Sequence, residues 1–125
     1  MYKLKTFSKK LLADTITPVN IYLKLRDIYA GSILLESSDY HGHENSLSFI
    51  CCQPIASFQV NDNKAEFRFP DGQSKSETIT KVGQVTTLFD EFRDAFLPDT
   101  IPSKYVNCGL FGYMAYDSIR YFDDV

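Results

Sequence analysis

Two β-prone runs joined by a short polar turn constrain this chain more than any other feature of its sequence. The runs cover residues 55–60 and 64–69, and an Asn-Asp-Asn turn at 61–63 separates them. Asparagine and aspartate tolerate the left-handed backbone conformation that a tight turn between antiparallel strands requires. A Pro-Asp-Gly turn at 70–72 then leads into a further β-prone run at about 75–80. The sequence therefore predicts an antiparallel meander near the middle of the chain.

Two stretches with helical spacing flank the meander. Thr17 followed by Pro18 is typical of a helix start, because a threonine side chain caps free N–H groups and proline fits the first helical position. We expect one helix over residues 17–29, ending before Gly31, and another over 83–96. The expected apolar stripes are Ile21, Leu25 and Ile28, flanked by Tyr22 and Tyr29, in the first helix and Val85, Leu88, Phe89, Phe92, Ala95 and Phe96 in the second.

Further β-prone segments lie on both sides of these elements. Residues 32–37 and 47–52 are predicted to be buried strands joined by a polar loop, and residues 2–6 alternate like an edge strand. The aromatic stretch 105–116 is expected to be a strand, whereas 117–122 fits either a helical turn or a continued strand. This order of elements predicts the α+β class, with a twisted, mainly antiparallel sheet flanked by two or three helices.

Composition and charge exclude several classes of function. Hydrophobic residues make up 44% of the chain and charged residues 23%, which is typical of a folded soluble domain. The formal net charge is −3, and the one basic cluster is too small to neutralise many phosphates, so nucleic-acid binding is not expected. No apolar run approaches the ~20 residues of a membrane-spanning helix, so we expect a cytoplasmic protein. The basic cluster consists of Lys3, Lys5, Lys9 and Lys10.

The cysteines favour a reducing compartment. Cys51 and Cys52 are adjacent in an apolar run, and Cys108 makes the total odd. Adjacent cysteines rarely reach the separation that a relaxed disulfide requires. We expect three free thiols that serve as small core residues rather than as nucleophiles.

Catalytic and metal-binding patterns are weak. His41, His43 and Glu44 could hold a divalent metal, but they lie in a polar loop without further ligands at set spacing, which favours a solvated loop. The glycines at 109 and 112 stand among aromatic residues and do not form a phosphate-binding loop. We therefore predict no catalytic residue and no metal ligand in this chain.

Glu36 is the one residue that resists a purely structural interpretation. It follows Leu34 and Leu35 directly at the end of a predicted strand and precedes Ser37. Burial of an unpaired carboxylate is costly, so Glu36 should either face solvent or hold a positive partner such as a bound ammonium group.

Three segments together resemble the amino-terminal region of anthranilate synthase component I. They are the Thr-Pro-Val start of the first helix at 17–19, the Ser-Ile-Leu-Leu-Glu-Ser-Ser run at 32–38, and the run from Gly109 to Phe122 that contains Gly-Tyr-Met-Ala-Tyr-Asp. Residues 46–50 with Pro54 also look like the second-strand pattern of that family. The resemblance covers most of the chain and implies that residues 1–125 are the family's amino-terminal domain, half of a larger α/β sandwich.

In that family the full protein is a lyase that converts chorismate to anthranilate and pyruvate. It uses Mg²⁺ and the ammonia that a glutamine amidotransferase partner, component II, releases from glutamine. The resemblance implies that the chorismate and magnesium residues lie in a carboxy-terminal chorismate-binding domain beyond Val125. This chain alone is then expected to be inactive.

The resemblance also implies an effector site for L-tryptophan, the feedback inhibitor. The family's Leu-Glu-Ser segment maps to Leu35, Glu36 and Ser37. Glu36 would accept the α-ammonium group, Ser37 would bond polar groups of the ligand, and Leu35 would wall the indole. The opposite wall would come from the carboxy-terminal domain. Where some members have a lysine in the second strand, this chain has Leu47.

Two alternatives remain open from the sequence. Component I of aminodeoxychorismate synthase shares the architecture and can retain the same pocket, and a stand-alone small-molecule-binding module would also fit an α+β domain. If the chain is part of a longer protein, separation from the carboxy-terminal domain should expose an apolar surface, and a homodimer could form through that surface. That surface is predicted to contain Phe111, Tyr113, Tyr116 and Phe122.

Overall fold

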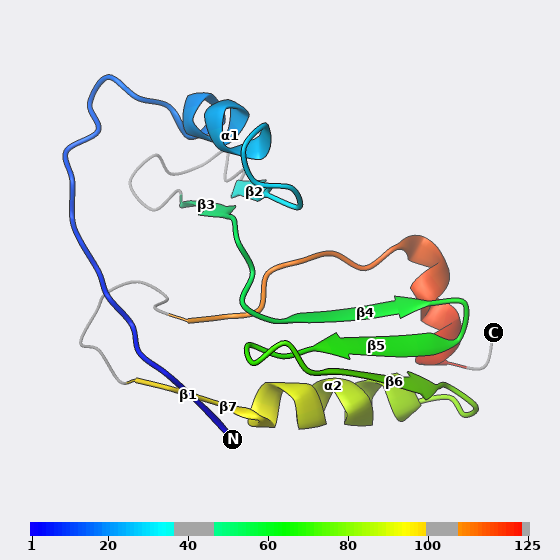
Figure 1. Ribbon diagram of the computed structural model, residues 1–125. Helices are drawn as coiled ribbons and strands as arrows, with labels where there is room; N and C mark the ends of the chain where they lie inside the picture. The colour runs from blue at the N-terminus through cyan, green and yellow to red at the C-terminus, as the bar shows by residue number, and fades with distance from the viewer. Residues whose placement is uncertain (37–46, 100–107, 124–125) are drawn as a thin grey trace. The chain divides into compact units, whose positions relative to one another are not determined.

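The computed structural model describes residues 1–36, 47–99 and 108–123 (Figure 1). The chain divides into two compact units. Unit 1 contains Met1–Ser8 and Ile55–Val125, and unit 2 contains Lys9–Pro54. The α+β class is confirmed, and most strand pairs are antiparallel, but the strands in the described residues form three small sheets rather than one.

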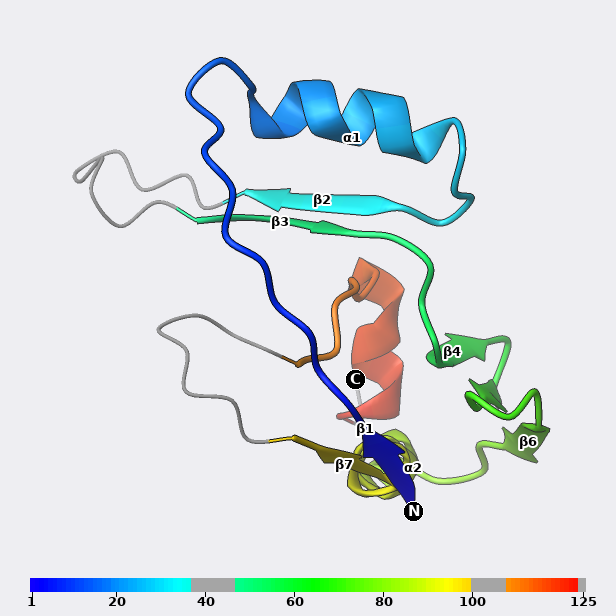
Figure 2. The same ribbon diagram turned by 60° about the vertical axis from the view of Figure 1, so that its left-hand side comes forward.

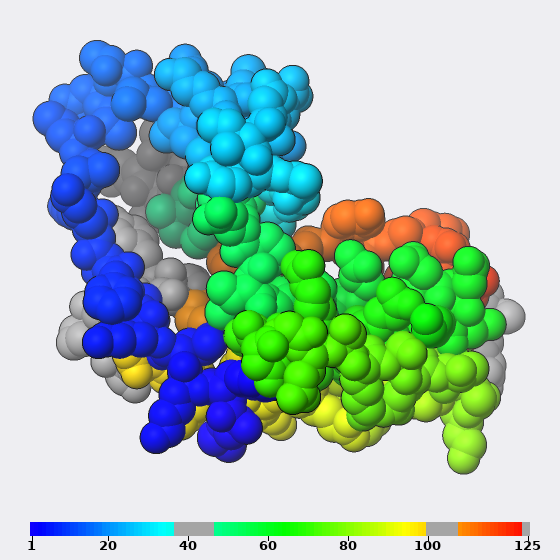
Figure 3. Space-filling view, in the orientation of Figure 1, coloured from blue at the N-terminus to red at the C-terminus, as the bar shows by residue number. Residues whose placement is uncertain are grey.

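The predicted meander is confirmed in unit 1. Strands β4 (Ser57–Asn61), β5 (Lys64–Arg68) and β6 (Ser74–Thr78) pair antiparallel in the order β4-β5-β6. Asp62 and Asn63 form the first turn with φ of 46° and 60°, the left-handed conformation expected of these residue types. In the space-filling view the three strands (green) form one continuous surface (Figure 3).

Helix α2 (Gln84–Asp94) follows the meander, and the prediction was wrong about where it ends. Phe96–Pro98 is not helical but forms strand β7, which pairs parallel with β1 (Tyr2–Leu4). The backbone N–H of Tyr2 donates to the carbonyl of Ala95 at 2.7 Å. This pairing satisfies backbone groups that a longer helix would have bonded internally, and the parallel partner lies too far away in sequence to be foreseen.

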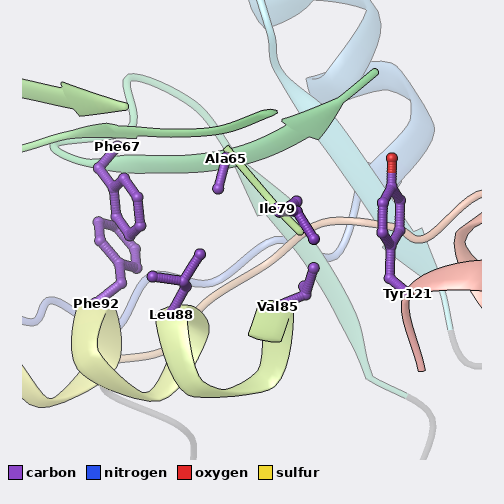
Figure 4. Close-up of a cluster of buried hydrophobic side chains, with 7 residues drawn as sticks. All are labelled: Ala65, Phe67, Ile79, Val85, Leu88, Phe92 and Tyr121. Carbon is purple, nitrogen blue, oxygen red and sulfur yellow. The ribbon is translucent and has the colours of Figure 1, made fainter. Parts of the chain in front are cut away.

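The core of unit 1 lies between the meander and α2 (Figure 4). Phe67 and Phe92 face each other across it, and Phe92 is only 1% exposed. Full burial of such a side chain contributes roughly 1.5–3 kcal/mol. The buried residues are Ala65, Phe67, Ile79, Val85, Leu88, Phe92 and Tyr121.

The aromatic stretch at residues 105–116 was predicted as a strand, and this prediction is wrong for its described part. Residues 105–107 lie outside the described part of the chain, and 108–115 contain no strand. The stretch Tyr116–Tyr121 is a 3₁₀ helix, η1, which agrees with the helical alternative for this region. A run of apolar residues indicates that the segment is buried or contacts another surface. The run alone does not show whether the segment is a strand.

The described residues of unit 2 contain helix α1 and a two-stranded antiparallel sheet. Helix α1 (Pro18–Arg26) begins as predicted, with the Thr17 hydroxyl accepting from the backbone N–H of Asn20 at 3.2 Å. It ends three residues before the predicted boundary at Tyr29. Strands β2 (Ile33–Glu36) and β3 (Ser48–Cys51) confirm the other two predictions, and α1 lies along them (Figure 2).

The inward stripe of α1 differs from the predicted one. Ile28 is 70% exposed, and Ile21 is also exposed. The half-buried side chains are instead Pro18, Tyr22, Leu25 and Tyr29, which recur at helical spacing. Two tyrosines therefore supply contact area that the sequence analysis had assigned to isoleucines. No residue of unit 2 in the described ranges is fully buried.

Candidate functional site

The candidate site lies at the end of β2 in unit 2. Glu36 is the last residue of this strand, and Leu35 precedes it. Ser37, the third predicted site residue, lies outside the described residues. The described part of the site comprises the last two residues of β2 and the residues of β3 that pair with them.

Strand register brings one residue to the site that the sequence analysis missed. Glu36 pairs with Ser48 of β3, and Leu35 pairs with Phe49. The Ser48 hydroxyl donates to Oε1 of Glu36 at 3.5 Å, a long hydrogen bond. No sequence motif marks Ser48, the first residue of β3. Its place opposite Glu36 follows only from the pairing register of the two strands.

The side chains of Leu35 and Glu36 point to opposite faces of the sheet, because successive side chains alternate along a strand. Glu36 shares its face with Ser48, Leu34 and Ile50, of which the last two are half-buried. A ligand held by the Glu36 carboxylate would thus border an apolar patch on one side of β2. It would reach the Leu35 side chain only around the end of the strand.

The end of β2 is exposed, although the sequence analysis predicted a buried strand. Ile33 and Leu34 are half-buried, whereas Leu35 is 37% exposed and Glu36 is also exposed. This outcome agrees with the expectation that Glu36 faces solvent unless it holds a positive group. Within the described residues Glu36 has no ion-pair partner, so its carboxylate can accept hydrogen bonds from a cation.

The cysteines are free but less buried than predicted. Cys51 and Cys52 are half-buried, and Cys108 is exposed, so the expectation of three core thiols is wrong for Cys108. Burial, followed by the neighbouring Cys52, raises the pKa of the Cys51 thiol. This shift favours the protonated thiol and opposes a nucleophilic role.

The described ranges contain neither a metal-binding cluster nor a helix that could span a membrane. No group of three His, Cys, Asp or Glu side chains there could hold a metal ion. The weak candidates His41, His43 and Glu44 lie outside those ranges. Neither α1 nor any other helix of the described chain is long and apolar enough to cross a membrane.

The predicted apolar surface in unit 1 is exposed. Tyr113 and Tyr116 are 91% and 93% exposed, and Phe111 and Phe122 are exposed to a smaller extent. Met114 and Leu110 belong to the same segment and are exposed as well. So much apolar side-chain area in one short segment is typical of a surface that contacts other polypeptide.

Comparison with known proteins identifies the class to which this α+β chain is similar. No family model matches it, and no solved structure shows significant similarity. Two curated proteins match nearly the whole chain, and both bear the same name.

Both matches are named anthranilate synthase component 1. The protein from Aquifex aeolicus is 29% identical over 119 residues, which are 93% of this chain and 23% of that protein. The protein from Mycolicibacterium smegmatis is 30% identical over 115 residues, which are 90% of this chain and 21% of that protein. The predicted resemblance is confirmed, and the chain spans about a fifth of the length of these relatives.

Proposed function

We propose that this chain is the effector-binding and packing portion of an anthranilate synthase component I. In the proposed reaction the whole protein converts chorismate and ammonia, released from glutamine, to anthranilate and pyruvate. Similarity to two proteins of that name over at least 90% of the chain supports the assignment. It also favours this reading over aminodeoxychorismate synthase, whose name neither relative bears.

The effector in this proposal is L-tryptophan, and the exposed carboxylate of Glu36 is the observation that carries it. Glu36 ends β2 beside the Ser48 hydroxyl and borders the apolar side chains of Leu34 and Ile50. An amino acid with a large apolar side chain offers an ammonium group for the carboxylate and a ring for the apolar border. Leu35 and Ser37 remain the other proposed contacts.

The partners in this proposal are polypeptides outside this chain. The exposed aromatic segment around Tyr113 and Tyr116 would pack against a chorismate-binding domain. A glutamine amidotransferase, component II, would supply the ammonia. The described residues contain no cluster that fits the magnesium ion of the proposed reaction, so we assign that ion no ligand here.

Inhibition kinetics on a full-length protein that carries this chain test the effector role. Glu36→Gln keeps the shape of the side chain but removes its charge, so tryptophan inhibition should weaken by about tenfold or more, as expected for loss of a charged hydrogen bond. Anthranilate formation without tryptophan should remain largely intact. Glu91→Gln, at an exposed position of α2, is the matched control and should leave inhibition unchanged. Loss of catalysis with unchanged inhibition would reject the assignment.

A further inference from the structure

A shallow depression in unit 1 combines two cations with a buried phenol and does not involve the effector site. Its volume is about 210 Å³, smaller than the roughly 300–1,000 Å³ of pockets for drug-sized ligands. It would therefore take a small molecule or a single functional group. The residues that line it are Asn63, Ile79, Thr80, Lys81, Val82, Arg120 and Tyr121.

The Tyr121 hydroxyl has a donor that its neighbours do not use. Its oxygen lies 3.1 Å from the backbone nitrogen of Asn63 and 2.9 Å from a guanidinium nitrogen of Arg120. Both neighbours can only donate, so the phenol oxygen accepts both bonds and its own hydrogen must seek another acceptor. Tyr121 is buried, at 7% exposure, and among the described residues its hydroxyl donates no hydrogen bond. In Figure 4 its hydroxyl points away from η1.

The charge of the lining favours an anion. Lys81 and Arg120 line the depression, and none of the described carboxylates does. Arg120 stacks on the Tyr121 ring, with its guanidinium carbon 4.9 Å from the ring centroid, and this contact holds the group in place. The hydrogen bond to Tyr121 raises the pKa of Arg120 most, and the nearby Asp117 and Asp62 add to this effect. These two carboxylates reduce the positive potential but lie outside the lining.

We infer that this depression binds a small oxyanion, a carboxylate or phosphate group, between the Arg120 guanidinium, the Tyr121 hydroxyl and the Lys81 ammonium. A guanidinium and a hydroxyl together offer the donors that a planar or tetrahedral oxyanion accepts. The side chain of Val82, which is 46% exposed at the rim, would contact an organic group attached to that anion. This inference does not depend on the proposed effector site, because all its residues belong to unit 1.

Titration of the 125-residue chain with sodium butyrate, and separately with sodium phosphate, tests the inference at constant ionic strength. Amide NMR shifts of Asn63, Thr80 and Tyr121 should move and saturate with at least one of the two anions. Saturation with butyrate alone would identify an organic carboxylate, and saturation with phosphate alone a phosphate group. Shifts that are absent, or that never saturate, would overturn the inference.

Variants separate this site from general charge effects. Arg120→Gln should weaken binding by about tenfold, and Lys81→Gln by a smaller factor, because Lys81 acts as a point charge without a fixed fork of donors. Arg93→Gln removes an exposed arginine of α2 and should change nothing. Tyr121→Phe keeps the buried ring and should also weaken binding. The inference would be contradicted if Lys81→Gln and Tyr121→Phe both bound the anion as tightly as the wild type. This comparison stands even if Arg120→Gln fails to fold.

Discussion

At the residue scale, the two candidate binding sites each depend on a polar side chain and its hydrogen-bond partners, Glu36 with Ser48 and Tyr121 with Asn63 and Arg120. Glu36 was singled out from sequence because a carboxylate directly after two leucines needs either solvent or a cation, and its exposure agrees with the first. Ser48 could not be singled out, because its contact with Glu36 depends on strand register. The role of the Tyr121 hydroxyl could not be predicted from the sequence for a similar reason, because its hydrogen-bond partner Asn63 is distant in sequence.

Asp71 gives a pH-dependent prediction at this scale. Its carboxylate accepts from the backbone N–H of Gln73 at 3.0 Å and from the Tyr2 hydroxyl at 2.8 Å. These bonds, the one from Gln73 first, lower the pKa of Asp71 below its ordinary value. A lowered folded-state pKa stabilises the fold above the unfolded-state pKa of about 3.9, and this contribution disappears as the pH falls through the folded value.

Urea unfolding at several pH values from about 7 to about 3 measures how this contribution to stability changes as the pH approaches the pKa of an aspartate. Asp71→Asn keeps the size of the side chain but cannot titrate. The wild type should exceed the variant in unfolding midpoint near neutral pH, and the difference should shrink as the pH falls below about 4. Asp14→Asn, which alters an exposed aspartate, serves as the control. A difference between wild type and Asp71→Asn that stays constant with pH would contradict the assigned role.

At the scale of elements, the parts of the fold set by local chemistry were predictable. The Asn-Asp-Asn turn, the Thr17 cap and the apolar stripe of α2 act within a few residues, and each element they predict is present. Strand β7 was missed because its partner β1 lies far away in the sequence. The strand predicted over the aromatic segment failed because apolar character alone does not say whether a surface is paired or exposed.

The turn between β4 and β5 offers a direct test of this local chemistry. Asn63 has φ of 60°, where glycine is unstrained and a β-branched residue is not. Asn63→Gly should leave stability unchanged or raise it slightly, whereas Asn63→Val should lower it by about 1–2 kcal/mol. Thermal or urea unfolding of the two variants makes the comparison. Equal stability of both would mean that the backbone conformation of this turn is not required.

At the scale of the whole molecule, unit 1 has a buried core and unit 2 does not within its described residues. A helix over a two-stranded sheet has little apolar area to bury by itself, so such a unit gains stability by packing against further polypeptide. This chain spans about a fifth of the length of its two relatives. The exposed tyrosines of unit 1 also offer apolar area for such packing.

We propose that the exposed end of β2 holds the ammonium group of an amino-acid effector through Glu36. Isothermal titration calorimetry of L-tryptophan into a full-length protein that carries this chain tests it most directly. The wild type should bind tryptophan saturably, and Glu36→Gln should bind it about tenfold more weakly. Equal binding by the two proteins, or no binding by the wild type, would contradict it.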